Sequence, residues 1–308
     1  MDKNQILKLL REFGGESAGE EICETIISTV TETVLADYIK KMLASALYSA
    51  EIKIIDMRNI EYHGGTTFSS GYLPKWDIGN IFIKLCDVGD KMQWLTDSLH
   101  ESYAMDLFVG SNAEIAAAVP AFALFFNAET HKEELRLCET AVKFSGDVTY
   151  YRDLRELHGY GRRQNDELID FAADFPGAVV SLLNMFAIDY IMNQEDRHAK
   201  NFGVFAGGLF TPLYDNGRSL HYDIPDDMLQ YVKIDEAAYI KFLAKDPMTV
   251  IRNYRDWLRA EPSIEFSAVL QNLSVIEKRY YGLLSPQRIR HNRNVIERRI
   301  EKCAEILT

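Results

Sequence analysis

Three side chains in the second half of the sequence have the types and spacing that phosphate chemistry requires: Asp196, Asn201 and Asp215. In phosphoryl transfer from ATP, one carboxylate orients the acceptor hydroxyl, while a side-chain amide and a second carboxylate hold Mg²⁺ against the phosphates. Kinase catalytic loops place the first Asp and the Asn five positions apart, and a D-x-G turn supplies the second Asp. The sequence therefore predicts Asp196 as the catalytic base and Asn201 and Asp215 as metal ligands.

The residues around these three strengthen the prediction, because a D-x-x-x-x-N spacing alone also occurs in ordinary surface loops. Here it begins in Asp196-Arg197-His198 and ends before two short apolar segments, at 202–205 and 209–213. Gly207-Gly208 separates the segments, which predicts a strand pair between the two polar turns. The second segment leads directly into Tyr214-Asp215-Asn216-Gly217. This combination favours a catalytic site over a surface loop.

The elements that must position these residues change in character along the chain. Strands are expected at 51–62 and 80–85 and in a hairpin spanning 122–138, a helix is expected at 93–110, and the last helix at 286–307. From about residue 147 onward the pattern is mostly helical. A strand-rich first half and a helix-rich second half predict an α+β fold of two lobes with a cleft between them. The expected divisions are a helical N-terminal extension at 1–50, an N-lobe at 51–145 and a helical C-lobe at 146–308.

Composition limits the classes of function. The formal net charge of −12, from 46 acidic and 34 basic residues, argues against a general nucleic-acid binder, because neutralising phosphates requires a basic face. Four widely spaced cysteines are typical of reduced thiols in a cytoplasm. The N-terminus is acidic where a signal peptide would be apolar, and the apolar stretch at 179–192 is too short to span a bilayer. We expect a cytoplasmic protein without direct nucleic-acid or membrane contact.

The motifs resemble those of a known family. DYIMNQEDRHAKNFGVF (189–205) followed by FTPLYDNG (210–217) is similar to the C-terminal lobe of HipA-like serine/threonine kinases. Upstream, SSGYLPKWDIGNIFIKL (69–85) resembles the nucleotide loop and ATP-lysine strand of small HipA-related kinases, and GLLSPQRIRHNRNVIERRI (282–300) resembles their last helix. The resemblance covers about 66 to 300, only loosely at 127–175, and does not include the first fifty residues.

The resemblance implies a bilobal protein-kinase-like fold with ATP and Mg²⁺ as cofactors. It supports the roles of the three residues above and implies that Lys84, on the polar side of an apolar strand, contacts the α- and β-phosphates. An acidic partner for Lys84 is then expected on the following helix. Glu101 is the preferred partner, with Asp97 and Glu114 as alternatives.

The resemblance also implies roles in two loops. The segment before the lysine strand lacks G-x-G-x-x-G, and its small residues, with Ser69, Ser70 and Gly71 as nucleotide-binding candidates, would let backbone amides approach phosphates. In HipA-like kinases a serine here is autophosphorylated and blocks nucleotide binding, which makes Ser69 and Ser70 candidates for that modification. In the catalytic turn, His198 would organise the loop, and Lys200 would lean toward the γ-phosphate.

The resemblance leaves the acceptor and the role of the chain open. A protein substrate with a Ser or Thr acceptor is favoured, but DRH-x-x-N is also the catalytic-loop signature of phosphatidylinositol kinases. A catalytically silent kinase-fold binding module is a third interpretation, although such a chain would be expected to have lost at least one key residue. Because HipA-like kinases often serve as toxins, an antitoxin-like partner protein is also expected.

Overall fold

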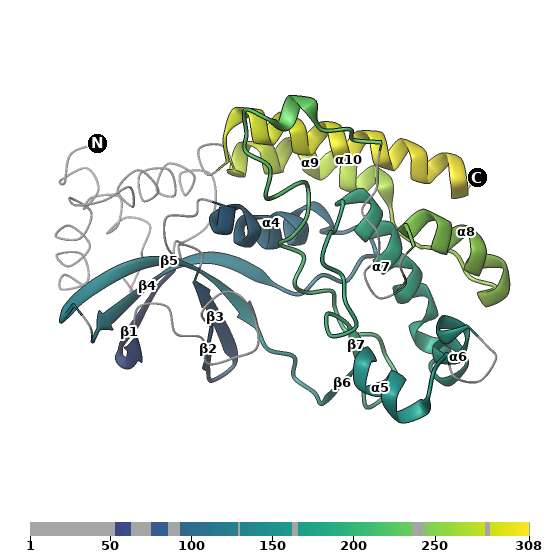
Figure 1. The fold of residues 1–308 in the computed structure, drawn as a ribbon, viewed down its shortest axis with the longest axis horizontal. Helices are drawn as coiled ribbons and strands as arrows, with labels where there is room; N and C mark the ends of the chain where they lie inside the picture. Colours follow the sequence, from purple (N-terminus) through teal and green to yellow (C-terminus); the bar gives the residue numbers. More distant parts are fainter. Residues whose placement is uncertain are drawn as a thin grey trace. The chain divides into compact units, whose positions relative to one another are not determined.

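The computed structural model describes residues 53–62, 75–85, 93–128, 130–161, 166–235, 243, 245–280 and 284–307. The chain divides into two compact units, of which the first takes in 1–102, 117–143 and 275–289 and the second takes in 103–116, 144–274 and 290–308. The expected helices of 1–50 and the loop residues Ser69, Ser70 and Gly71 lie outside the described residues. The described elements confirm the α+β class, with strands dominating the first part of the sequence and helices the second (Figure 1).

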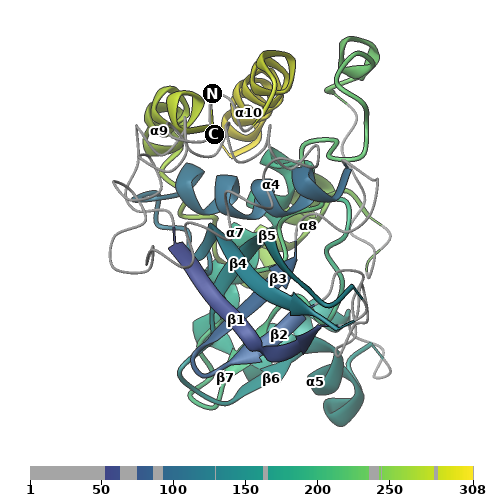
Figure 2. The ribbon, with the colours of Figure 1, turned by 90° about the vertical axis from the view of Figure 1, so that its left-hand side faces the viewer.

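The first unit is built on a five-stranded sheet. Its strands are β1 (Lys53–Tyr62), β2 (Lys75–Ile78), β3 (Ile81–Leu85), β4 (Ala118–Asn127) and β5 (Lys132–Val142). Their order in the sheet is β1-β4-β5-β3-β2, and Figure 2 shows the five strands grouped together. The pair of β1 and β4 is parallel, and the other neighbours are antiparallel. The predicted strands and the predicted hairpin are confirmed, while the pairing strand β2 was not foreseen.

One face of this sheet carries the apolar core of the first unit. Ile83 and Leu85 on β3 are fully buried and share that core with Cys138, Ala121 and other side chains of the same sheet. Because side chains alternate along a strand, Phe82 and Lys84 belong to the opposite face. Phe82 is 42% exposed, in keeping with that alternation. The two-residue period of β3 thus decides the face on which Lys84 stands.

Helices make up most of the second unit. α5 (Tyr151–His158), α6 (Glu167–Asp174), α7 (Val179–Ile191) and α8 (Pro247–Leu258) lie within it, and α4 (Gln93–Leu107), α9 (Phe266–Tyr280) and α10 (Pro286–Leu307) contribute residues to both units. Side chains of Asp166 and Asp246 cap α6 and α8 by accepting hydrogen bonds from backbone amides of the first turn. α7 is buried from Leu182 to its end, so its C-terminus is a fixed point for the polar turn that follows.

A short two-stranded sheet continues from that turn. β6 (Val148–Tyr150) pairs with β7 (Gly203–Phe205) in an antiparallel register that sets Tyr150 against Gly203. A Cβ at Gly203 would meet the carbonyl oxygen of Thr149 at 2.4 Å, so only glycine allows this approach. The predicted strand at 209–213 forms two isolated bridges instead, from Phe210 to Val204 and from Leu213 to Ile115.

Among the described residues no single helix has the length and apolarity needed to cross a membrane, and only the pair formed by Glu167–Asp174 and Pro176–Ile191, bent by 111°, satisfies both conditions together.

Candidate active site

The end of α7 anchors the polar turn through a buried ion pair. Arg197 and Asp189 are 0% and 1% exposed. Arg197 Nε donates to both carboxylate oxygens of Asp189 at 3.1 Å, and Nη2 donates to Oδ1 at 2.9 Å. Burial raises the pKa of the Asp189 carboxyl, and the guanidinium beside it opposes this change. Two charges are tolerated at such depth only as a hydrogen-bonded pair.

Arg197 also holds both ends of the segment that follows it. Its Nη1 donates to the carbonyl oxygens of Tyr214 at 2.8 Å and Asn201 at 3.4 Å. Its Nη2 donates to Oδ1 of Asn216 at 2.6 Å. The fixed fork of a guanidinium can reach several acceptors in one plane. One buried side chain therefore joins α7, the Asp196–Asn201 turn and the Asp215 turn.

Gln194 connects the backbones of Asp196 and Asp215, the two residues that carry the predicted carboxylates. The residue is 2% exposed and lies just after α7. Its Oε1 accepts a hydrogen bond from the backbone amide of Asp196 at 2.8 Å. Its Nε2 donates to the backbone carbonyl of Asp215 at 3.1 Å. The base candidate and the metal-ligand candidate, 19 residues apart in sequence, thus share the two ends of one buried amide.

Asn201 is oriented toward the same place. Its Nδ2 donates to the backbone carbonyl of Asp196 at 3.3 Å, and its own amide donates to the carbonyl of His198 at 2.9 Å. The residue is 2% exposed. With the nitrogen end engaged, the Oδ1 end of the side chain is the one available as an acceptor. The structure therefore brings Asp196, Asn201 and Asp215 together.

Asp215 has a left-handed backbone, with φ of 58°. Aspartate tolerates this conformation better than most residues, because its short side chain can bond locally. Its side chain is half-buried, and its neighbour Tyr214 is held from the other direction by donating its hydroxyl to the carbonyl of Lys200 at 2.5 Å. Burial raises the pKa of Tyr214, which keeps the hydroxyl protonated as a donor.

His198 and Lys200 both lie in the predicted turn but differ in burial. His198 is half-buried, and its Nδ1 accepts a hydrogen bond from the amide of Lys200 at 3.3 Å. The role of His198 in organising the loop stays a prediction. Lys200 is exposed, and its position toward the γ-phosphate stays a prediction.

Lys84 belongs to the first unit, on β3. Glu101, the predicted partner, is 4% exposed on α4 in the same unit, whereas the alternative Glu114 belongs to the second unit. Glu139 on β5 lies directly across the ladder from Lys84 and is 3% exposed. Directly opposed side chains in an antiparallel pair have Cβ atoms about 4.5–5.5 Å apart. Glu139 is therefore a further acidic candidate, on the strand next to Lys84, and the choice of Glu101 stays a prediction.

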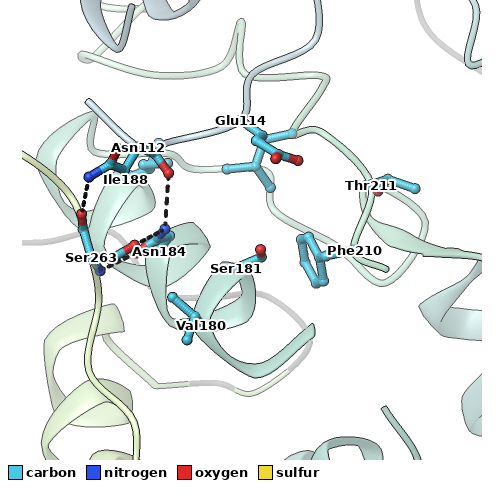
Figure 3. A pocket seen from close by; sticks show the side chains of 10 residues that line it. Asn112, Glu114, Val180, Ser181, Asn184, Ile188, Phe210, Thr211 and Ser263 are labelled. Carbon is cyan, nitrogen blue, oxygen red and sulfur yellow. Dashed lines mark hydrogen bonds between the residues drawn. The ribbon is translucent and has the colours of Figure 1, made fainter. Parts of the chain in front are cut away.

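A pocket of about 90 Å³, partly open to solvent, lies in the second unit and contains none of the predicted catalytic or metal-binding residues. Figure 3 shows Asn184 of α7 at its floor, bonded to the carbonyl of Asn112 at 3.4 Å and to the amide and hydroxyl of Ser263 at 2.7 and 3.1 Å. These bonds tie α7 to the loop after α4 and to the segment before α9, so the polar lining is largely structural.

Sequence reasoning missed the residues that organise the site: Asp189, Gln194, Arg197 and Asn216. Two signals were present. Asp189 is the one charged residue inside a mostly apolar helix, and Arg197 directly follows the base candidate. A charge in an apolar helix requires a counter-charge. Their pairing was not foreseen because partners eight residues apart across a turn follow no helical or strand period.

No protein-family model matches the chain, and no curated protein sequence matches it. Among solved structures the chain is similar to the Helicobacter pylori proinflammatory kinase CtkA, with a TM-score of 0.48 and 13% sequence identity, over 82% of this chain and 96% of that one.

Proposed function

We propose that the chain is an ATP- and Mg²⁺-dependent phosphotransferase of the HipA-like serine/threonine kinase type. Asp196 acts as the base, and Asn201 and Asp215 hold the metal. The observation that carries the proposal is the Gln194 bridge, which bonds to the backbones of both Asp196 and Asp215. A base and a metal ligand must keep a fixed separation for in-line transfer, and a shared buried amide supplies such a constraint.

The side chains fit Mg²⁺. The ion prefers oxygen ligands and is usually held by one or two protein groups together with phosphate oxygens and water. Asn201 offers its amide oxygen because its amide nitrogen is engaged by the carbonyl of Asp196. Asp215 offers a carboxylate on a turn whose backbone Gln194 holds. When bound, Mg²⁺ would neutralise charge on the phosphate oxygens.

The reaction itself requires few protein groups. The oxygen of the acceptor hydroxyl forms a bond to the γ-phosphorus, the bond from that phosphorus to the β–γ bridging oxygen breaks, and ADP leaves. The hydroxyl proton passes to the carboxylate of Asp196. Lys84, on a strand with a fixed register, would contact the α- and β-phosphates. Positioning and charge, rather than covalent catalysis, provide most of the rate.

For the acceptor we propose a serine or threonine of a protein, including one in this chain's own nucleotide loop. We also propose that the chain binds an antitoxin-like partner protein. Two alternatives are a phosphoinositide acceptor and a silent binding module. Serine phosphate on a protein, phosphate on lipid vesicles, or nucleotide binding without turnover would distinguish the three.

The test is transfer of γ-phosphate from Mg²⁺-ATP to the protein itself and to a panel of protein and phosphoinositide acceptors. We expect wild type to transfer phosphate and Asp196→Asn to lose roughly 10²–10⁴-fold in rate, the usual contribution of a general base. Asp215→Asn should lose transfer together with Mg²⁺-dependent nucleotide binding. Asp256→Asn is the matched control, because Asp256 on α8 has a side chain that is 86% exposed.

Wild-type protein that neither transfers phosphate nor binds Mg²⁺-ATP would contradict the proposal. Transfer that persists in both Asp196→Asn and Asp215→Asn would show that the chemistry belongs to other residues. Calorimetry on the same four proteins separates loss of binding from loss of chemistry.

A further inference from the structure

Arg218 lies beside the base candidate. Its Nη1 is 3.3 Å from Oδ2 of Asp196, and the two side chains are 28% and 19% exposed. The guanidinium carbon is 5.7 Å from the ring centroid of Tyr222. The guanidinium of Arg218 is therefore partly shielded from solvent, but a ligand beside the Asp196 carboxylate could still reach it.

The backbone around Arg218 is fixed on both sides. Its carbonyl accepts a hydrogen bond from the amide of Glu195 at 2.8 Å. Two residues later, the amide of Leu220 donates to the carbonyl of Met192 at 2.7 Å. These bonds join the chain after the Asp215 turn to the chain just before Asp196. Arg218 is therefore held at the base by the backbone as well as by its ion pair.

The charge of the proposed site favours a cation at the position of Arg218. Asp196 and Asp215 are carboxylates, and a nucleotide triphosphate adds several negative charges. During transfer, charge spreads over the three equatorial oxygens of the phosphoryl group, and groups already oriented toward them lower the barrier. A guanidinium can contact a carboxylate with one edge and phosphate oxygens with the other, because its five N–H donors lie in a fixed fork.

We propose that Arg218, rather than Lys200, binds the γ-phosphate of ATP and links it to Asp196. The inference rests on the proposed phosphotransferase function and adds a catalytic residue to it. Lys200 is the weaker choice, because its side chain is exposed while Arg218 contacts the base directly. Arg218 would then contact both the γ-phosphoryl group that is transferred and Asp196, which accepts the proton.

The first test measures the preference for a γ-phosphate without requiring turnover. Calorimetry with Mg²⁺-AMPPNP (a non-hydrolysable ATP analogue) and with Mg²⁺-ADP gives the ratio of the two Kd values. We expect Arg218→Met to reduce the preference for AMPPNP by about tenfold to a hundredfold, as for loss of a hydrogen bond to a charged group. Arg218→Lys should lose less, and Arg252→Met, an exposed α8 control, should match wild type.

The second test separates a catalytic role from a structural one. In Arg218→Ala we expect kcat to fall more than KM for ATP rises, and added guanidinium at non-denaturing concentration to restore part of kcat. Thermal melts of all variants establish that the folded protein is being compared. A side chain that only held the loop would show no rescue by guanidinium.

Three outcomes distinguish the two proposals. Wild type that binds neither nucleotide overturns the phosphotransferase proposal and this inference with it. Wild type that prefers AMPPNP, with the preference intact in Arg218→Met but lost in Lys200→Met, overturns only the assignment of Arg218. Loss in Arg218→Met, with Lys200→Met near wild type, supports it.

Discussion

The two units position their functional candidates by different means. In the first, Lys84 stands on a regular strand whose opposite face is apolar, and Ile83 and Leu85 on either side of it are fully buried. In the second, Asp196 and Asp215 stand on irregular turns, and their backbones are fixed by hydrogen bonds with buried polar side chains such as Gln194.

The difference has a physical consequence. Apolar packing is non-directional, so a sheet tolerates moderate changes in volume and still keeps its register. A buried polar network is directional, and each member left without its partner incurs the full desolvation cost. The second arrangement can define a separation between two turns more closely, but it depends on each residue in the network.

The largest effect is expected at the ion pair of the second unit. Arg197→Met should destabilise the protein by about 3–5 kcal/mol, because it leaves the buried Asp189 without its counter-charge. Chemical denaturation measures the free energy of unfolding, and Arg252→Met on the exposed face of α8 is the control. The double variant Arg197→Met/Asp189→Leu should recover only part of the loss, since Arg197 also donates to the carbonyl of Tyr214. Full recovery would show that only the ion pair matters.

The core of the first unit gives the next effect. Ile83→Ala should cost about 2–5 kcal/mol, the usual range for removing a fully buried aliphatic side chain. Phe82→Ala, its exposed neighbour on β3, should cost much less. Nucleotide affinity of the folded fraction should change little in Ile83→Ala, because β3 keeps its register with β5 and Lys84 therefore keeps its position. A large loss of affinity without loss of stability would contradict the view that the buried face of β3 serves stability and the face of Lys84 serves binding.

Gln194→Ala should have a smaller effect on stability and a larger one on activity. Removing the amide leaves the backbone amide of Asp196 and the carbonyl of Asp215 without this partner, which costs about 1–3 kcal/mol. Because the spacing of the two turns then relaxes, kcat should fall while the protein remains folded. Kinetics and denaturation on the same preparation measure both. Unchanged kcat would show that Arg197 alone fixes the separation.

The smallest effect concerns an exposed ion pair, in contrast to Asp189. Hydrogen bonds from Lys302 and Arg298 hold the pKa of Asp235 below its usual value of 3.8. Its contribution to stability is therefore present above that pH and is lost as pH falls through the lowered pKa. Between pH 5 and pH 2, Asp235→Asn should lose slightly less stability than wild type. Thermal melts across this pH range measure the difference. Since Asp235 is exposed, solvent and salt screening keep the effect small.

Much of the fold could be predicted from local patterns. The strand expected at 80–85 is β3, and the last helix expected at 286–307 is α10, whose bounds are those expected. The strand expected at 209–213 was right in its antiparallel contact with β7, where the amide of Phe205 donates to the carbonyl of Leu209 and the amide of Thr211 to the carbonyl of Gly203. It was wrong in extent, because the segment forms isolated bridges and not a continuous strand.

By itself, the sequence determined which side chains could perform the chemistry: the types and spacing of Asp196, Asn201 and Asp215, and the strand that carries Lys84. Only the tertiary structure decided what holds them. Asp189 and Arg197 meet across the end of α7, Gln194 spans two turns, and Arg218 reaches the base. Periodic patterns report which face of an element is buried, whereas hydrogen bonds between irregular turns depend on where a buried helix ends and on which polar groups are buried beside it.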